Sequence, residues 1–353
     1  MLGQPAQKFD SVAAQAAQAR DSENLDEAVR LYGQAVRLRP GWTEGWWYLG
    51  TIAYDRGRFR QAVDALGKVT VLAPRDPKAF AMLGLSEAKL NQNQPALTHL
   101  AQALTLGVGD DANMRQVVLF TQANLLLYAG AFGRAQEILD RLAKERTNAD
   151  DELPMALGRS VLGVRPVNST TATATRDLIL TAGRAEMLAA NRETGDALSA
   201  YKDLVKRFPK VHNVEFAYGR FLLNNHLNDE AVAAFKREIV NSPEHLLARL
   251  GIAGALLSID PAASRIYAEQ AVNLAPKLEE AHYLLGASLL AMGDAGRSVS
   301  ELETAEHLNT GDPRVYFALA KAYQRVHRDR DAAHAREKFV RLSPAIANKG
   351  AAN

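Results

Sequence analysis

A spacing of about 34 residues between prolines is the feature that most constrains how this chain can fold. Pro40 and Pro74 lie 34 residues apart (74 − 40), and Pro209, Pro243 and Pro276 follow at 34 (243 − 209) and 33 (276 − 243) residues. Proline stops a helix because it lacks a backbone N–H and its ring collides with the preceding turn. A fixed period of this length indicates repeated units that stack on their neighbours.

Each period carries the same pattern of aromatic, small and apolar residues. Residues 46–54 read Trp-Trp-Tyr-Leu-Gly-Thr-Ile-Ala-Tyr, and the pairs Leu83-Gly84 and Leu285-Gly286 stand at the matching places of other periods. We expect the small residues to lie where two helices cross closely, because a larger side chain would push the helices apart. One helical hairpin cannot bury such a face alone, so consecutive hairpins must stack.

At these residues the chain resembles the tetratricopeptide repeat (TPR) family, with which it shares the W-x₂-L-G pattern and the period. The resemblance implies an all-α fold, a right-handed superhelical solenoid of about nine TPR helix-turn-helix repeats. It also implies a concave groove, lined by the first helix of each repeat, that binds a peptide or a partner helix. The residue usage of the repeats is similar to that of bacterial multi-repeat TPR proteins.

The period is interrupted once, near the middle of the chain. We expect an N-terminal TPR array of about four repeats at 9–149 and a C-terminal array of about five repeats at 178–346. Between them, 150–177 is predicted to contain a short helix and a Thr-rich linker, which either forms a hinge or packs on the solenoid. Residues 347–353 are predicted to be a flexible tail.

Composition and charge exclude several classes of function. The chain has 42 Lys and Arg against 40 Asp and Glu, a net charge of +2, so no basic surface for nucleic acid is expected. It has no cysteine, which excludes thiolate metal sites and disulfides. No apolar run is long enough to span a membrane.

No motif points to an enzyme. The eight histidines show no metal-binding spacing such as H-E-x-x-H, and no nucleotide-binding glycine motif occurs. We therefore expect no catalytic residues, no metal and no cofactor. Because no signal peptide is recognised, the expected location is cytoplasmic, with a periplasmic or exported location as the alternative if the N-terminus has been trimmed.

The candidate binding residues come from the groove-facing positions that the resemblance assigns. Trp47 and Tyr48 are the sharpest of these, because neighbours on a helix point about 100° apart and cannot all face inward. They are predicted either to anchor a peptide or to pack against the preceding hairpin. The full candidate set for partner binding is Trp47, Tyr48, Tyr54, Met82, Phe120, Asn124, Tyr128, Phe216, Arg220, Tyr283, Phe317 and Lys321.

The predicted function is that of a non-catalytic scaffold or adaptor that binds another protein in its groove. A TPR subgroup grips a partner's C-terminal carboxylate with Lys and Asn, but the matching positions here hold residues such as Ala13, Ala17 and Thr51. That mode of binding is therefore not expected. The alternative is a structural or self-associating TPR assembly protein, in which a second copy covers the ends of the solenoid.

Overall fold

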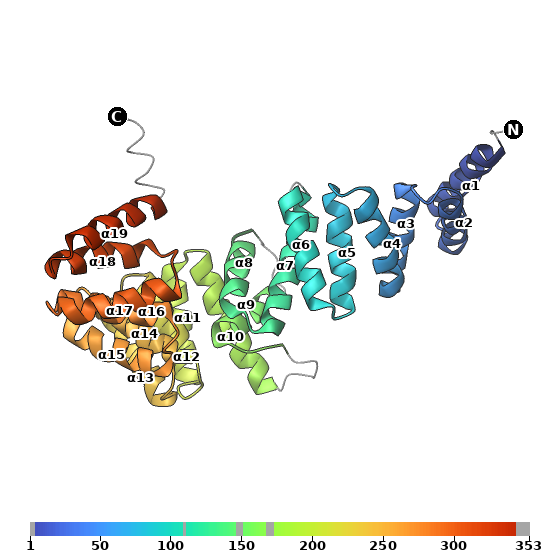
Figure 1. Ribbon diagram of the computed structural model, residues 1–353. Helices are drawn as coiled ribbons and strands as arrows, with labels where there is room; N and C mark the ends of the chain where they lie inside the picture. Colours follow the sequence, from blue (N-terminus) through green and yellow to red (C-terminus); the bar gives the residue numbers. More distant parts are fainter. Residues whose placement is uncertain (1–3, 109–110, 146–150, 167–172, 344–353) are drawn as a thin grey trace. The chain divides into compact units, whose positions relative to one another are not determined.

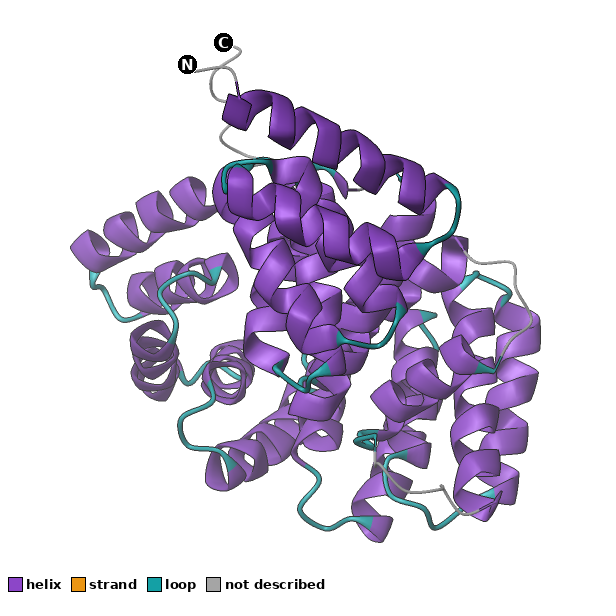
Figure 2. Ribbon diagram, turned by 90° about the vertical axis from the view of Figure 1, so that its right-hand side faces the viewer, coloured by secondary structure: helices purple, strands orange, loops and turns teal. Residues whose placement is uncertain are grey.

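The computed structural model describes residues 4–108, 111–145, 151–166 and 173–343. In these ranges the regular structure is α-helical and no strand occurs (Figure 2). The predicted tail at 347–353 and most of the predicted Thr-rich linker lie outside the described residues. The chain divides into two compact units, unit 1 (Met1–Glu193) and unit 2 (Thr194–Asn353). The predicted all-α fold is confirmed.

Helices that follow one another in the sequence pack side by side in both units (Figure 1). The helices of unit 1 are α1 (Gln4–Asp21), α2 (Leu25–Leu38), α3 (Thr43–Asp55), α4 (Phe59–Leu72), α5 (Pro77–Lys89), α6 (Asn93–Leu106), α7 (Ala112–Ala129), α8 (Phe132–Glu145), α9 (Glu152–Leu162) and α10 (Thr173–Ala190). The helices of unit 2 are α11 (Thr194–Arg207), α12 (Val214–Asn224), α13 (Asn228–Asn241), α14 (Leu246–Leu256), α15 (Pro261–Leu274), α16 (Glu279–Ala291), α17 (Ala295–Leu308), α18 (Pro313–Arg325) and α19 (Asp329–Leu342). The number of helices agrees with about nine hairpins.

The small residues of the repeat lie where the two helices of a hairpin cross, as predicted. A Cβ atom added to Gly50 of α3 would stand 2.5 Å from the Leu66 side chain of α4. The same addition at Gly286 of α16 would stand 2.7 Å from Leu302 of α17. These distances are shorter than van der Waals contact. The two helices can therefore cross this closely only because glycine has no side chain.

The hairpin turns repeat with the same period as the helices. In unit 1 the left-handed residues Glu23, Gly57 and Asn91 have φ values of 58°, 69° and 58° and are spaced by 34 residues (57 − 23 and 91 − 57). In unit 2, Gly293 and His327 have φ values of 91° and 61° and the same spacing (327 − 293). Each left-handed residue closes the first helix of its hairpin, so that free carbonyl groups at the helix end are satisfied.

Helix α9 is not part of a repeated hairpin, and it packs tightly against α10. A Cβ atom on Gly158 of α9 would stand 1.9 Å from the Ile179 carbonyl oxygen, and one on Gly183 of α10 would stand 1.7 Å from the Pro154 oxygen. The backbones of α9 and α10 therefore touch where a glycine of each helix faces the other. Within the predicted 150–177 segment, the part that the structure describes contains this packed helix.

The start of α7 is fixed by a side-chain cap. The Asp111 side chain accepts a hydrogen bond from the Met114 backbone N–H at 3.1 Å and caps a helix that begins at Ala112. An Asp at the N-cap satisfies one of the free N–H groups of the first turn, which allows the helix to start there.

Candidate functional site

Each unit contains one groove that collects residues predicted to bind a partner. The unit 1 groove has a volume of about 620 Å³ and lies along α3, α5, α7 and α9. Its lining residues are Tyr54, Leu85, Ala88, Lys89, Val117, Phe120, Thr121, Asn124, Leu125, Tyr128, Glu152, Met155, Ala156, Arg159 and Pro166. Four of the twelve predicted binding residues are therefore brought together here: Tyr54, Phe120, Asn124 and Tyr128.

Helix α7 supplies most of the predicted residues of the unit 1 groove because of its helical period. Phe120, Asn124 and Tyr128 follow at intervals of four residues and lie along one face of the helix. Phe120 packs at its base against the core of unit 1, whereas 43% of the Tyr128 surface is exposed. This face therefore combines an anchored ring with an accessible one.

The unit 1 groove carries polar groups of both charges among its apolar ones. Lys89 of α5 and Glu152 and Arg159 of α9 line it together with Asn124. Burial lowers the pKa of the Arg159 guanidinium, which donates a hydrogen bond to the Arg165 carbonyl at 3.3 Å. Burial also raises the pKa of the Tyr54 hydroxyl. An occupant of this groove meets hydrogen-bonding groups as well as aromatic rings.

Trp47, Tyr48 and Met82 lie elsewhere in unit 1. The Tyr48 ring stacks on Tyr32 of α2 at a centroid distance of 5.2 Å, and the Arg20 guanidinium lies 4.0 Å from the centroid of the same ring. Trp47 packs, partly buried, against the core around α3 to α6, of which Met82 is a buried member. None of the three lines the unit 1 groove.

The unit 2 groove is smaller, with a volume of about 450 Å³, and is lined by α16, α18 and α19. Its lining residues are Tyr283, Ala287, Leu290, Ala291, Pro313, Arg314, Phe317, Ala318, Lys321, Arg325 and Phe339. Three of the predicted binding residues, Tyr283, Phe317 and Lys321, meet in it. The Phe317 and Phe339 rings lie 5.3 Å apart, and the Lys321 ammonium lies 3.9 Å from the Phe317 ring centroid.

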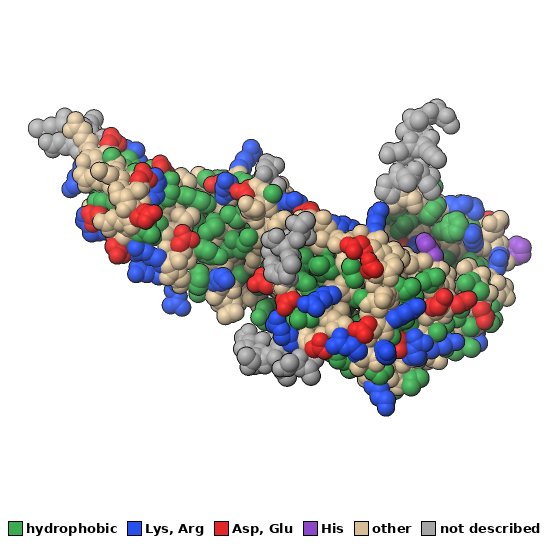
Figure 3. Space-filling model, turned by 180° about the vertical axis from the view of Figure 1, so that it is seen from behind, with side chains coloured by type: hydrophobic (Ala, Val, Ile, Leu, Met, Phe, Trp, Pro, Cys, Tyr) green, Lys and Arg blue, Asp and Glu red, His purple; other side chains and the backbone are tan. Residues whose placement is uncertain are grey.

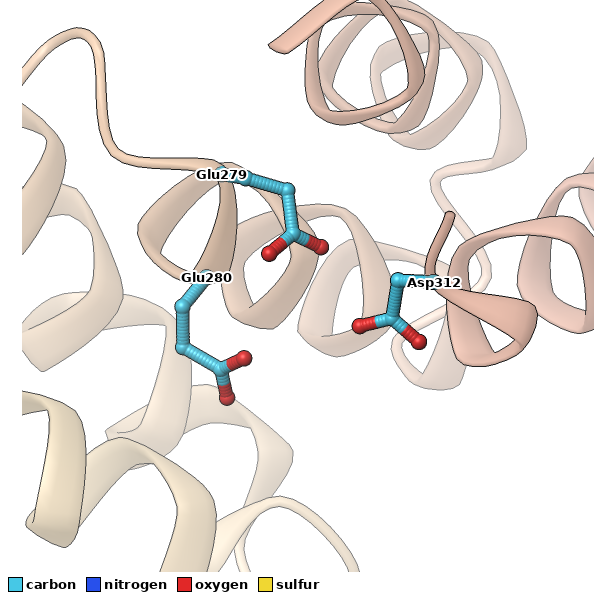
Figure 4. A group of neighbouring side chains, drawn as sticks. All are labelled: Glu279, Glu280 and Asp312. Atoms are coloured by element: carbon cyan, nitrogen blue, oxygen red, sulfur yellow. The ribbon is translucent and has the colours of Figure 1, made fainter. Parts of the chain in front are cut away.

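Arg314, at one side of the unit 2 groove, lies in a group of carboxylates. Figure 4 shows the three carboxylates of this group, Glu279, Glu280 and Asp312. Its guanidinium bonds Glu280 at 2.5 Å and Asp312 at 2.6 Å and lies 4.7 Å from the Tyr283 ring centroid. Burial opposes ionisation of Asp312, but the hydrogen bonds from Arg314 prevail and lower the pKa of that carboxyl group. The hydrogen bond that Arg314 donates to Asp312 in turn raises the pKa of Arg314.

Glu279 is the carboxyl group of this cluster that Arg314 does not bond. Oxygens of Glu279, Glu280 and Asp312 lie within 4.8 Å of one another, and the buried Oε1 atom of Glu279 has no hydrogen-bond partner among the described residues. Burial, and then the charges of Asp312 and Glu280, raise the pKa of Glu279 to about 7. Because Arg314 is the cation that the other two carboxylates hold, the cluster is an ion-pair network that orients Arg314 against Tyr283.

Two cations of the unit 2 groove differ from the cations around it. Arg328 pairs with Glu303 at 2.9 Å and Lys338 pairs with Glu306 at 2.8 Å. Among the residues that the structure describes, Lys321 and Arg325 form no ion pair with a carboxylate. Arg325 donates one hydrogen bond to the Leu290 carbonyl oxygen. Both Lys321 and Arg325 line the groove.

Phe216 and Arg220 lie on α12, which does not line the unit 2 groove. The Phe216 ring contacts Phe235 and His245, with centroids 5.8 and 4.7 Å apart. Beside it the fully buried Glu238 carboxylate accepts a hydrogen bond from the Phe216 backbone N–H at 3.2 Å and caps the start of α12. Phe216 thus serves the packing of α12 on its neighbours.

Several groove residues carried no signal in the sequence. Helix α9 belongs to no repeat, so the pattern gave no reason to place Glu152 or Arg159 in a groove. Arg325 is the last residue of α18 and lines the unit 2 groove, although it is not among the predicted binding residues. Phe339 lies on the second helix of its hairpin, where the resemblance assigns no binding position. The sequence feature that could have indicated α9 is its periodic apolar face, which lies outside the repeats.

The charged side chains on the face drawn in Figure 3 do not separate by sign. Lys and Arg (blue) and Asp and Glu (red) are interspersed over that face, with apolar side chains (green) between them. This arrangement agrees with the nearly balanced composition of 42 basic and 40 acidic residues. The side chains of this face therefore form no broad patch of one sign of charge.

The described helices place this chain in the class of helical-hairpin repeat proteins. A tetratricopeptide repeat model matches residues 14–79, 48–112 and 183–245. The matched segments are tetratricopeptide repeats, and the chain is a tetratricopeptide repeat protein. Proteins of this family present extended concave surfaces and generally serve as scaffolds for protein interaction.

Several solved structures are similar to about half of this chain. MamA RS-1 ArsTM double mutant is 20% identical over 48% of this chain and 95% of that chain, with a TM-score of 0.45. MamA 41-end from Desulfovibrio magneticus RS-1 is 20% identical over 48% of this chain and 96% of that one, with a TM-score of 0.44. YrrB, a TPR protein with an unusual peptide-binding site, is 18% identical over 48% and 87%, with a TM-score of 0.42.

No match to the sequence occurs among the curated proteins. In the part of the chain that the structure describes, no helix combines the length and the apolar character that a membrane span requires.

Proposed function

We propose that this protein is a scaffold that binds a segment of another protein in the unit 1 groove. The observation that carries the proposal is the convergence of Tyr54 from α3 with Phe120, Asn124 and Tyr128 from α7 in one groove of about 620 Å³. A groove of this size holds several side chains of a ligand.

The chemistry of the groove supports a peptide ligand in particular. Aromatic rings give a large contact area with little loss of side-chain entropy, which makes residues such as Tyr128 effective anchors. Asn124 and Arg159 offer hydrogen-bond donors, and Lys89 and Glu152 offer charges of both signs. A peptide backbone presents carbonyl and N–H groups that such side chains bind.

The proposal is tested with a display library of random dodecapeptides, selected on the wild type and on Tyr54→Ala/Tyr128→Ala. We expect peptides that bind the wild type with micromolar affinity and at least tenfold more weakly to the double variant, because two aromatic anchors are lost. The control is Val71→Ala, whose side chain on α4 is 78% exposed and lies outside the groove. It should leave both the affinity and the melting temperature unchanged.

Either of two results would contradict the proposal. The first is that selected peptides bind the double variant as tightly as the wild type. The second is that the double variant melts several degrees lower, in which case Tyr54 and Tyr128 serve packing. A matched single variant, Asn124→Ala, separates these cases further, because it removes a polar contact without removing an aromatic ring.

A further inference from the structure

We propose that the unit 2 groove is a second and chemically distinct binding site, which takes an extended acidic segment with one bulky apolar anchor. The proposal rests on the proposed function only in that the ligand is a protein segment. It names the chemistry that this groove recognises, and it stands on the contacts around α18.

The floor of the groove fits an apolar anchor. Phe317 is 47% exposed, although it is a large aromatic residue, and its ring is 5.3 Å from that of Phe339. Leu290, Ala287 and Ala318 also line the groove, and no Asp or Glu is among its described lining residues. Single exposed apolar residues are ordinary on proteins, but an exposed ring that packs on a partly buried ring within a groove is typical of a binding surface.

The rim of the groove fits carboxylates. Lys321 and Arg325 lack a carboxylate partner in the described residues, whereas Arg314, Arg328 and Lys338 each have one. The Lys321 ammonium lies over the Phe317 ring, and the Arg325 guanidinium donates a hydrogen bond to the Leu290 carbonyl oxygen. These contacts direct each cation along the groove wall. Charge complementarity therefore favours an acidic ligand.

The spacing of the two cations favours an extended ligand. Lys321 and Arg325 are four residues apart on one helix, which places them about 6 Å apart along its axis at ~1.5 Å per residue. On an extended chain, side chains two residues apart share one face and are about 6.6 Å apart. Two carboxylates at alternate positions of an extended segment therefore match the spacing of the two cations. The apolar anchor of the segment would stand two positions before the first carboxylate.

The test uses a synthetic peptide as the probe. It is a fluorescein-labelled, end-capped dodecapeptide with one Phe followed by Glu two and four positions later, and Ser or Gly elsewhere. Binding to the full chain is followed by fluorescence anisotropy. We expect saturable binding that falls at least tenfold with Lys321→Glu and with Phe317→Ala. Lys236→Glu makes the same charge change on α13 outside the groove and should leave binding within a factor of two.

A charge-reversal experiment keeps the test independent of folding. The same peptide with Lys in place of both Glu residues should bind the wild type at least tenfold more weakly and should recover affinity for Lys321→Glu/Arg325→Glu. A peptide with its Glu residues one and two positions after Phe should bind more weakly than the probe, because one carboxylate then points away. Absence of saturable binding to 1 mM, equal binding of the Lys peptide, or tighter binding of a peptide with Glu four positions apart would each overturn the proposal.

Two controls separate this site from its alternatives. The probe should bind Tyr54→Ala/Tyr128→Ala as tightly as the wild type. The two proposals are therefore tested separately: the unit 1 groove can fail as a peptide site while the unit 2 groove binds the probe, and the unit 2 groove can fail while the unit 1 groove binds its peptides. Light scattering over a concentration series tests a second copy of the chain as the occupant. A dimer that Phe317→Ala abolishes would assign the groove to self-association and overturn the acidic-segment proposal.

Discussion

Both grooves are lined by the first helices of successive hairpins, α3, α5 and α7 in unit 1 and α16 and α18 in unit 2. The unit 1 groove adds α9, a helix outside the repeat, and holds Lys89, Glu152 and Arg159 beside its aromatic residues. The unit 2 groove adds the last described helix, α19, and combines an apolar floor with two cations that have no carboxylate partner.

The difference between the two grooves shows which residues of a repeat protein determine its ligand selectivity. The glycine–leucine crossings recur in both units, at Gly50 with Leu66 and at Gly286 with Leu302. They determine how the helices pack and do not determine which ligand a groove binds. Lys321 stands where Ala287 stands one period earlier (321 − 34), and Arg159 lies on a helix outside the repeat. Residues of this kind determine the charge and polarity of each groove. Two grooves with one architecture are therefore expected to select different ligands.

The largest effect that separates the grooves is expected at the crossing of α9 and α10. Gly158→Ala places a Cβ 1.9 Å from the Ile179 carbonyl oxygen, so the helices must separate, and we expect a loss of about 3 kcal/mol in the stability of unit 1. Urea unfolding followed by tryptophan fluorescence measures it, because Trp42, Trp46 and Trp47 all belong to unit 1.

The same variant tests whether α9 builds the unit 1 groove. Peptides selected on that groove should bind Gly158→Ala at least tenfold more weakly, while the acidic probe of the unit 2 groove should bind as before. Gly67→Ala is the matched control: nothing lies within 4 Å of the added atom, so it should stabilise unit 1 by about 0.5 to 1 kcal/mol. Unchanged binding of both ligands to Gly158→Ala would show that α9 contributes nothing to recognition.

A smaller effect distinguishes the grooves by pH. The pKa of Glu279 is raised from 4.5 to about 7, so the folded chain retains a proton that the unfolded chain releases between these values. Stability from this group is therefore present below pH 4.5 and is lost as pH rises to 7. Glu279→Gln should stabilise unit 2 at pH 8 by about 1 kcal/mol, after allowance for solvent screening, and have little effect near pH 4.5.

The measurement combines urea unfolding followed by circular dichroism with an NMR titration of the Glu279 carboxyl carbon. Glu244→Gln removes an exposed carboxylate of unit 2 and is the control, with no change expected at either pH. The acidic probe should also bind the unit 2 groove less tightly at pH 8 than at pH 6, because ionised Glu279 adds negative charge beside Arg314. A stabilisation by Glu279→Gln that is equal at pH 4.5 and pH 8 would contradict the assigned protonation.

The smallest expected effect is the response of each groove to salt. Raising ionic strength from 50 to 500 mM should weaken binding of the acidic probe to the unit 2 groove by about three- to tenfold, because exposed cations are screened within a few ångströms at high salt. Peptides of the unit 1 groove, which has charges of both signs, should change by less than about twofold. Equal salt responses in the two grooves would remove the electrostatic distinction between them.

Much of the fold could be predicted from the sequence because each hairpin is determined by residues within one period. Leu66 packs on Gly50 only sixteen residues away (66 − 50), and such local contacts leave a regular pattern. Phe120 and Tyr128 could be nominated for the same reason, since helical spacing fixes which face they share. The predicted domain boundaries and the role of each nominated residue remain predictions.

What the sequence pattern could not predict depends on contacts between elements that do not repeat. The Arg165 side chain lies close to Gly130, and the Arg165 carbonyl oxygen accepts a hydrogen bond from the Arg159 side chain. The repeat pattern predicts neither contact. Tyr48 and Phe317 are both aromatic and both on a first helix, yet Tyr48 stacks on Tyr32 while Phe317 stays 47% exposed. The neighbouring hairpin decides which ring is covered, and that neighbour is specific to each place in the array.

The left-handed turns have a consequence for how the number of hairpins can change. Gly57 and Asn91 have the same sign of φ, and each is followed by the N-cap of the next helix, Arg58 or Gln92. Removing residues 58–91 would join Gly57 directly to Gln92 and recreate an intact turn at the splice. A duplication of the same segment would do likewise, so an array can lose or gain a cassette of this length without any new backbone geometry at the junction.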